Sequence, residues 1–194
     1  AAAFLPLSTH RITSSPNTLE SSTGWGAALF GGEVDWDAAI AGLGASFRLT
    51  DPGFDIKRFP AQIYMQRSIE AALNLRETPG LRTDDIEAVV VETNRPGYGG
   101  SGAPSGLAGK FSLEYCVAIA LLDGRVAIDS FANDRYFAPD VQLLLGKVHV
   151  ISDTTLAGAQ VSARMAEGRT FSETCVDFRG AMANPMLGNP ITTA

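Results

Sequence analysis

The clearest pattern of hydrophobic and polar positions lies at residues 61–76. Pro60 suits the first position of a helix, and apolar residues recur after it every three or four positions, so we predict a helix over this range. Its apolar stripe consists of Met65, Ile69, Ala72 and Leu73. A second row of residues, spaced four apart on a neighbouring face, can touch polar groups: Gln62, Gln66 and Glu70.

Further helical patterns lie on both sides of this range. Residues 107–122 are apolar nearly all round and end at Asp123-Gly124, which predicts a buried helix at the centre of the core. Shorter helical patterns occupy 128–131 and 139–145. An acidic start at 35–37 followed by apolar positions and a glycine at 44 predicts one more short helix.

The remaining patterns are typical of strands. Residues 86–93 (IEAVVVET) are β-branched and apolar, which predicts a central strand covered on both faces. Residues 47–58 are also strand-like around a turn at 51–53. Short alternating runs predict three more strands, at 147–152, 160–166 and 170–178. A hairpin is expected to join the last two of them. Together these elements predict an α+β fold with a small mixed or antiparallel sheet packed with helices.

Composition narrows the class of protein. Apolar residues make up 45% of the 194 residues and charged residues 19%, which is a globular balance. The net charge is −6 and no basic stripe is visible, so we expect no nucleic-acid partner. No apolar run reaches the roughly 18 residues of a membrane span, and the first ten residues do not read as a signal peptide. We expect a cytoplasmic protein without a membrane partner.

Cysteine and histidine residues are few and do not form ligand pairs. Cys116 and Cys175 lie in apolar surroundings without a CxxC spacing, and His10 and His149 are far apart in the chain. We therefore expect no metal site and no cofactor, and we interpret both cysteines as small buried hydrophobic residues.

The first candidate for chemistry is the pair Lys57-Arg58, directly before the helix predicted at 61–76. Free amide groups and the helix dipole favour an anion at such a place, and an adjacent lysine adds a point charge that can bind a carboxylate. The alternative is that both residues are ordinary solvated charges, which is the commoner case for surface cations.

The second candidate is the glycine-rich stretch at 94–106, which contains a literal GxGxxG (GYGGSG, 97–102). A dinucleotide site is one interpretation, but Pro96 ends the strand early and Pro104 delays the helix, so the third glycine does not reach the strand-helix junction. Mobility of a long connection is the preferred account. Lys110, at the start of the next helix, could face a ligand or could pair with Glu114 one turn on.

The order of these motifs resembles the MmgE/PrpD family. The resemblance covers about residues 19–190 and lies in the Ile-Lys-Arg-Phe-Pro segment before a helix, the strand that ends near Asn94-Arg95-Pro96, and the phrase from Lys110-Phe111-Ser112 to Leu122-Asp123-Gly124. It implies that residues 1–45 flank a helical domain, that 46–182 form an α+β lid, and that 183–194 return as a loop. It also implies a lid that lacks most of the acid-base residues, and therefore a chain inactive by itself.

The resemblance further implies a lyase that acts on a small polycarboxylate and forms a homodimer at full length. The expected reaction is dehydration of the 2-methylcitrate type, and the alternatives within the family are epimerisation of the iminodisuccinate type and decarboxylation of the cis-aconitate type. Two alternatives come from other classes of protein: a nucleotide-binding oxidoreductase domain that uses the GYGGSG stretch, and a non-catalytic binding module. Gln62 and Gln66 replace histidines of related enzymes, and Glu92 stands where the decarboxylase has tyrosine. Lys57 is the expected catalytic residue, and the expected substrate contacts are Arg58, Gln62, Glu92, Arg95, Tyr98 and Lys110.

Overall fold

The computed structural model describes residues 16–31, 34–45, 47, 49, 53–94 and 102–186. Its chain divides into two compact units, residues 1–53 and residues 54–194. The second unit contains the sheet and the helices that cover it.

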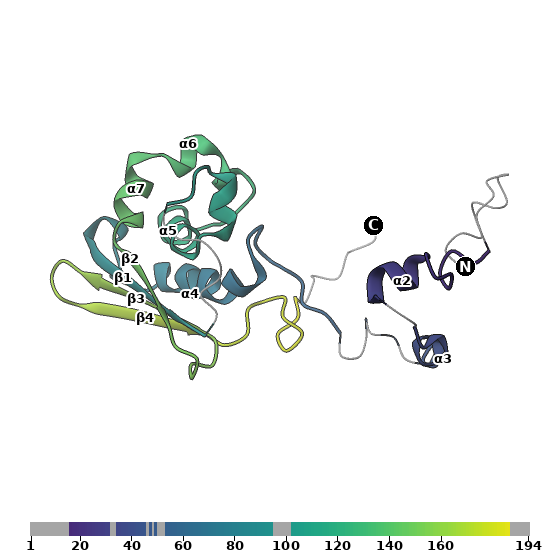
Figure 1. Cartoon of the computed structure of the whole chain (residues 1–194). Coiled ribbons are helices and arrows are strands. Elements are labelled where there is room, and N and C mark those ends of the chain that lie inside the picture. The colour runs from purple at the N-terminus through teal and green to yellow at the C-terminus, as the bar shows by residue number, and fades with distance from the viewer. Residues whose placement is uncertain are drawn as a thin grey trace, which may run out of the picture. The chain divides into compact units, whose positions relative to one another are not determined.

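A four-stranded mixed sheet with the order β2-β1-β3-β4 forms the second unit's base (Figure 1). The first two strands of this order run parallel, and the other neighbours are antiparallel. The strands are β1 (Ile86–Thr93), β2 (Val148–Ser152), β3 (Ala159–Met165) and β4 (Thr170–Cys175). A hairpin joins β3 to β4 through Gly168, whose φ of 90° suits glycine. The predicted α+β class, the interior position of the strand at 86–93 and the hairpin are confirmed.

Two long helices, α4 (Gln66–Arg76) and α5 (Leu113–Asp123), pack beside each other on one face of the sheet (Figure 1). The shorter α7 (Pro139–Leu145) packs on α5, as the pattern at 139–145 predicts. The remaining elements in the described part of the unit are α6 (Asn133–Tyr136) and the 3₁₀ turns η2 (Ile63–Met65), η3 (Thr83–Asp85), η4 (Leu107–Phe111) and η5 (Asp129–Phe131). Among the residues that the structure describes, no helix combines the length and apolar composition that crossing a membrane requires.

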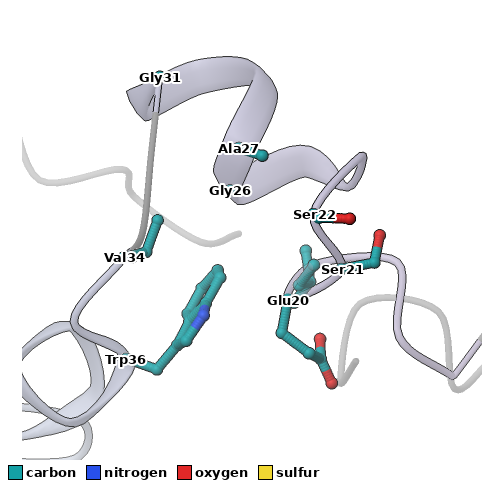
Figure 2. A pocket seen from close by; sticks show the side chains of 9 residues that line it. Glu20, Ser21, Ser22, Gly26, Ala27, Gly31, Val34 and Trp36 are labelled. Carbon is teal, nitrogen blue, oxygen red and sulfur yellow. The ribbon is translucent and has the colours of Figure 1, made fainter.

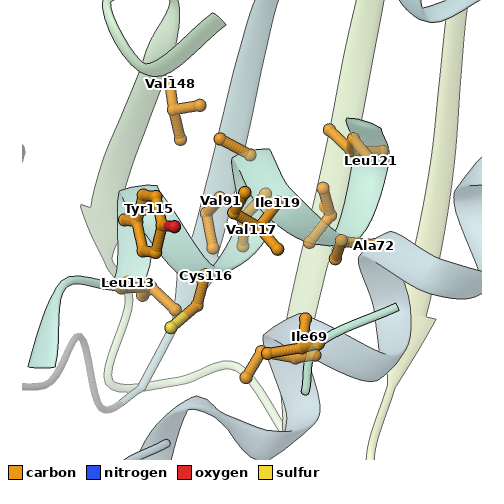
Figure 3. Close-up of a cluster of buried hydrophobic side chains, with 14 of the residues drawn as sticks. Ile69, Ala72, Val91, Leu113, Tyr115, Cys116, Val117, Ile119, Leu121 and Val148 are labelled. Atoms are coloured by element: carbon orange, nitrogen blue, oxygen red, sulfur yellow. The ribbon is translucent and has the colours of Figure 1, made fainter. Parts of the chain in front are cut away.

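The core lies around α5, whose residues from Leu113 to Leu121 are buried except for Glu114. This helix is apolar all round because it contacts α4, α7 and β2 on different sides. Figure 3 shows its side chains in one cluster with Ile69 of α4 and Val91 of β1. Each large apolar side chain buried there stabilises the fold by about 1.5 to 3 kcal/mol. Both cysteines are free and buried, as expected from their surroundings.

The strand β1 is interior, but the expectation that both of its faces are covered is wrong for the described residues. Val89, Val91 and Thr93 are buried beneath the helices, whereas Val90 and Glu92 are only half-buried on the opposite face. The neighbouring strands carry polar residues on that face, including a hydroxyl pair between Ser162 and Ser172 at 2.9 Å. Apolar composition alone did not reveal this, because β-branched residues also occupy half-exposed strand positions.

The helix predicted at 61–76 begins later than expected, since α4 starts at Gln66 after the turn η2. Pro60 is therefore not its first residue. Backbone groups before Gln66 are used elsewhere, because the Gln62 amide donates to the Lys110 carbonyl at 3.2 Å. Of the predicted apolar stripe, Met65, Ile69 and Ala72 are fully buried, and Leu73 is partly buried.

Two further predictions are corrected. The range 107–122 is not one helix: η4 ends at Phe111, and Ser112 caps α5 by accepting a hydrogen bond from the Tyr115 amide at 3.2 Å. The strand expected at 47–58 does not form over 53–58, where Ile56 makes a single backbone bond to the Gly180 carbonyl at 2.7 Å. The pattern at 128–131 corresponds to the 3₁₀ turn η5.

The first unit contains two short helices, α2 (Trp25–Phe30) and α3 (Trp36–Ile40). Asp35 caps α3 by accepting from the Ala38 amide at 2.9 Å, which agrees with the predicted acidic start. An open pocket of about 680 Å³ lies between the helices and is lined in part by Glu20, Ser21 and Trp36 (Figure 2). Gly26 is the one buried residue among those described here, so the described part of this unit forms no core of its own.

Candidate active site

The candidate site is an open pocket of about 820 Å³ in the second unit. It is formed where the segment before α4 approaches the connection that follows α5. We call residues 57–62 the 57–62 segment and residues 126–129 the 126–129 wall. The lining residues are Lys57, Arg58, Phe59, Pro60, Val126, Ala127, Ile128 and Asp129.

Lys57 brings a positive charge to this pocket on an exposed side chain. No hydrogen bond or ion pair joins its ammonium group to another residue in the described part of the chain. Phe59 and Val126, which line the same pocket, are each 6% exposed and belong to the apolar core. An ammonium group beside such apolar residues attracts an anion more strongly than one surrounded by water.

Arg58 also lines the pocket, but its guanidinium group is already engaged. Its Nη1 lies 3.3 Å from Oε1 of Glu70, and its Cζ lies 5.1 Å from the centre of the Phe59 ring. The Glu70 carboxylate also accepts the Arg179 amide at 2.7 Å. Arg58 thus ties the 57–62 segment to α4, and Lys57 is the cation of this pair that is available to a ligand.

The 126–129 wall is held in place by hydrogen bonds to buried groups. Tyr115 of α5 donates its hydroxyl hydrogen to the Ser130 carbonyl, and the Ala127 amide donates to the Ser130 hydroxyl at 3.1 Å. Burial raises the pKa of Tyr115, so its hydroxyl stays a donor at neutral pH. The wall presents Ile128, which is 78% exposed, to the pocket side of the unit.

Asp129 is the acidic residue of the wall, and it is paired. Its carboxylate accepts two hydrogen bonds from Arg125, at 3.0 and 2.6 Å. These bonds to the guanidinium group hold the pKa of Asp129 below its usual range. The pair is neutral as a unit at neutral pH, which leaves the Lys57 charge without a competing anion on the opposite wall.

Gln62 and Lys110 lie next to each other but do not line the pocket. The Gln62 amide donates to the Lys110 carbonyl, and the Gln62 Oε1 atom is buried without a hydrogen-bond partner among the described residues. The Lys110 ammonium lies 5.5 Å from the centre of the Phe131 ring, in a cation-π contact. The alternative pairing with Glu114 is not formed; Glu114 accepts from the Ser112 hydroxyl instead.

The other predicted contacts are not brought to this pocket. Glu92 lies on β1 opposite Ile151 and Gln160, on the sheet face that the helices leave open. Arg95 and Tyr98 lie outside the described residues, as does most of the glycine-rich stretch. The structure thus brings together Lys57 and Arg58, with Gln62 and Lys110 close by.

The amide donors expected at the helix start are already used. The Phe59 amide donates to Oε1 of Gln66 at 3.0 Å, the Ala61 amide to the Phe59 carbonyl at 2.8 Å, and the Gln62 amide to Lys110. The expectation of exposed N–H groups beside Lys57 is therefore wrong at these three positions. The feature of this pocket that would favour an anion is therefore the positive charge of Lys57, and not the start of the helix.

Two contributions to the site do not stand out in the residue pattern. The 126–129 wall overlaps the short helical pattern at 128–131, and its signal was the apolar run Val126-Ala127-Ile128, which begins two residues after the helix-ending Gly124. Gln66 was expected on a polar face, yet it is fully buried. Its place next to buried Met65 and three positions before buried Ile69 was the signal for a structural role.

The second unit is an α+β domain with an open pocket lined by Lys57, Arg58 and Asp129 among apolar residues. Residues 59–191 match the MmgE/PrpD C-terminal domain, so the chain belongs to the MmgE/PrpD family. It is also similar to cis-aconitate decarboxylase from Homo sapiens, with 26% identity over 153 residues, a match that covers 73% of this chain and 32% of the relative. The chain spans about a third of the length of that relative.

Proposed function

We propose that this chain is the lid of a lyase that acts on small polycarboxylates. Two facts support the proposal: the chain carries the C-terminal domain of the MmgE/PrpD family, and a relative is named for the decarboxylation of cis-aconitate, a tricarboxylate. The observation that carries it is the Lys57 side chain, which lines the pocket without an ion-pair partner among the described residues.

Our proposed reaction is dehydration of the 2-methylcitrate type. A base removes a proton from the carbon next to a carboxylate, a hydroxyl group leaves the neighbouring carbon, and the products are water and a carbon-carbon double bond. Negative charge builds on the carboxylate oxygens as the proton leaves, and a fixed cation stabilises this charge. Lys57 supplies that cation, while the acid-base groups come from outside this lid.

The first unit fits a flank of a further helical domain. Several of its described large apolar residues are more than half exposed, among them Trp25, Leu29, Phe30, Ile40 and Leu43. Exposed apolar side chains in such number are typical of a surface that another element covers. We propose that the rest of the full-length protein covers this surface and supplies the acid-base residues.

The test is an assay of the full-length protein that contains this chain. Citrate, 2-methylcitrate and related tricarboxylates are offered one at a time, and formation of a conjugated double bond is followed by ultraviolet absorbance. Decarboxylation is followed in parallel by release of carbon dioxide, and epimerisation by optical rotation. A protein inactive on the whole panel in all three assays would rule out the proposed function.

Variants of Lys57 test its role. Lys57→Met keeps the length of the side chain and removes its charge, so kcat should fall about 100- to 1,000-fold. Arg164→Met is the matched control, because Arg164 is an exposed cation on the open face of the sheet. Turnover equal to that of the unaltered protein in Lys57→Met would remove Lys57 from the mechanism.

A further inference from the structure

Gln66 forms a paired contact with the backbone of the 57–62 segment. Its Oε1 accepts the Phe59 amide hydrogen at 3.0 Å, and its Nε2 donates to the Phe59 carbonyl at 3.0 Å. The Nε2 group also lies 3.4 Å from the Gln62 carbonyl oxygen. Gln66 is completely buried, so water does not compete for these bonds. One side chain therefore satisfies both polar groups of a residue two positions after Lys57.

The contact matters because it fixes the backbone that carries Lys57. Phe59 is anchored in the core by its ring and by the two Gln66 bonds, and the flanking Arg58 is tied to Glu70. The Gln62 amide bonds to the Lys110 carbonyl at the far end of the segment. These contacts hold the backbone on both sides of Pro60, while the Lys57 side chain stays open to the pocket.

We propose that Gln66 is a positioning residue: through the Phe59 backbone it holds Lys57 at the place where the substrate's developing negative charge will form. The proposal rests on the proposed lyase function. Gln66 does not line the pocket, so it acts through the segment. An amide side chain suits this role because it carries a donor and an acceptor in one plane and does not titrate.

Replacing Gln66 by glutamate tests the hydrogen bonds to Phe59 separately from the packing of the side chain. Glutamate has nearly the same shape, but its ionised form has no donor for the Phe59 carbonyl. When protonated, the carboxyl group donates again and restores both bonds. Burial raises the pKa of such a carboxyl above about 4.3, which brings the change toward an accessible pH range. The charged residues on the elements that meet there are Arg67, Glu70 and Arg76 on α4, Lys57 and Arg58 on the segment, and Lys110 on η4.

The experiment compares three variants, Gln66→Glu, Gln66→Ala and Gln142→Glu, with the unaltered full-length protein. At each pH, the kcat and the KM of a variant are divided by those of the unaltered protein. Gln66→Ala should lower kcat about 10- to 100-fold, with a smaller change in KM, because a small displacement of a charge-stabilising group acts on the transition state. Gln66→Glu should match the alanine variant at high pH and approach the unaltered protein as pH falls. Gln142 also donates to a backbone carbonyl, that of Tyr136, but it lies outside the pocket, so its ratios should not change with pH.

Amide hydrogen exchange at Phe59 supplies a readout that needs no turnover. Exchange should accelerate in Gln66→Ala and should slow again in Gln66→Glu at low pH. If the unaltered protein turns over a polycarboxylate while the Gln66→Glu ratio stays constant with pH, the positioning role is wrong and the lyase proposal stands. If the unaltered protein is inactive on the whole panel, the lyase proposal falls, and the positioning role that rests on it falls too.

Discussion

Arg135 binds Asp123 through two hydrogen bonds, from Nε to Oδ2 at 3.1 Å and from Nη2 to Oδ1 at 2.6 Å. The same guanidinium group also bonds the Asp140 carboxylate, at 2.9 and 3.0 Å. Asp123 ends α5, Arg135 lies on α6 and Asp140 lies in the first turn of α7. One side chain thus joins three helices that follow each other along the chain, and the 126–129 wall belongs to the connection between α5 and α6.

Arg135→Ala should therefore lower the stability of the second unit. Arg135 and Asp123 are each about one quarter exposed, so their bonds are partly shielded, and losing charged hydrogen bonds of this kind costs about 1 to 3 kcal/mol. Thermal unfolding should show a Tm lower by several degrees. The control is Arg125→Ala, whose ion pair with Asp129 is mostly exposed and should contribute little. Equal shifts in the two variants would contradict a special role for Arg135.

The ionised Asp140 carboxylate should make the stability of the fold depend on pH in acid. Its hydrogen bonds from Arg135 hold its pKa below the usual value near 3.9, so the folded state binds this proton less readily than the unfolded state. The contribution is then fully present above the unfolded pKa and is lost as pH falls through the lowered folded pKa. Between about pH 5 and pH 2, Tm should fall less in Asp140→Asn than in the unaltered protein. Parallel curves for the two proteins would contradict the prediction.

Sequence patterns predicted best those helices and strands whose signals lie within the segment itself. The strand at 86–93 and the short helix at 139–145 were found because hydrophobic periodicity and glycine or proline signals lie within the segments themselves. The split of the range 107–122 into η4 and α5 was missed because Phe111 continues the apolar pattern. It is more than half exposed, however, and Ser112 ends that turn as a helix cap.

The candidate site was predicted only in part because it depends on contacts between distant segments. Lys57 stood out because cations before a predicted helix are a recognisable pattern. The facing wall lies about 70 positions later, and no periodicity relates the two stretches. The role of Gln66 was hidden for the same reason, since its partner is the backbone of Phe59 and backbone groups leave no trace in residue patterns.

Cys116 and Cys175 should react slowly with thiol reagents in the folded protein. Burial is the main reason that the pKa of Cys175 is raised to about 11, and it raises the pKa of Cys116 as well. The thiolate is the reactive form, so at pH 8 only about one Cys175 group in a thousand is reactive. Labelling with a chromogenic disulfide should be slow until denaturant is added. Rapid labelling of either thiol in the native protein would contradict this burial.

The last prediction concerns Gly180, which supports the segment that leads to Lys57. Its carbonyl accepts the Ile56 amide at 2.7 Å, its φ is 113°, and a Cβ added there would lie 2.3 Å from the Ile56 carbonyl oxygen. Gly180→Ala must therefore shift the backbone next to Lys57 as well as strain position 180. Gly168 is the matched control: its φ of 90° is also positive, but a Cβ there meets no atom within 4 Å.

Both variants should lose stability through backbone strain, by about 1 kcal/mol for Gly168→Ala. Gly180→Ala should lose more, and it alone should accelerate amide exchange at Ile56 and weaken the binding of a tricarboxylate to the full-length protein, because the Lys57 ammonium moves relative to the 126–129 wall. Calorimetry, amide exchange and ligand titration measure these three effects. If the two variants lose stability equally and bind the ligand equally well, contact between Gly180 and the Ile56 backbone does not position Lys57.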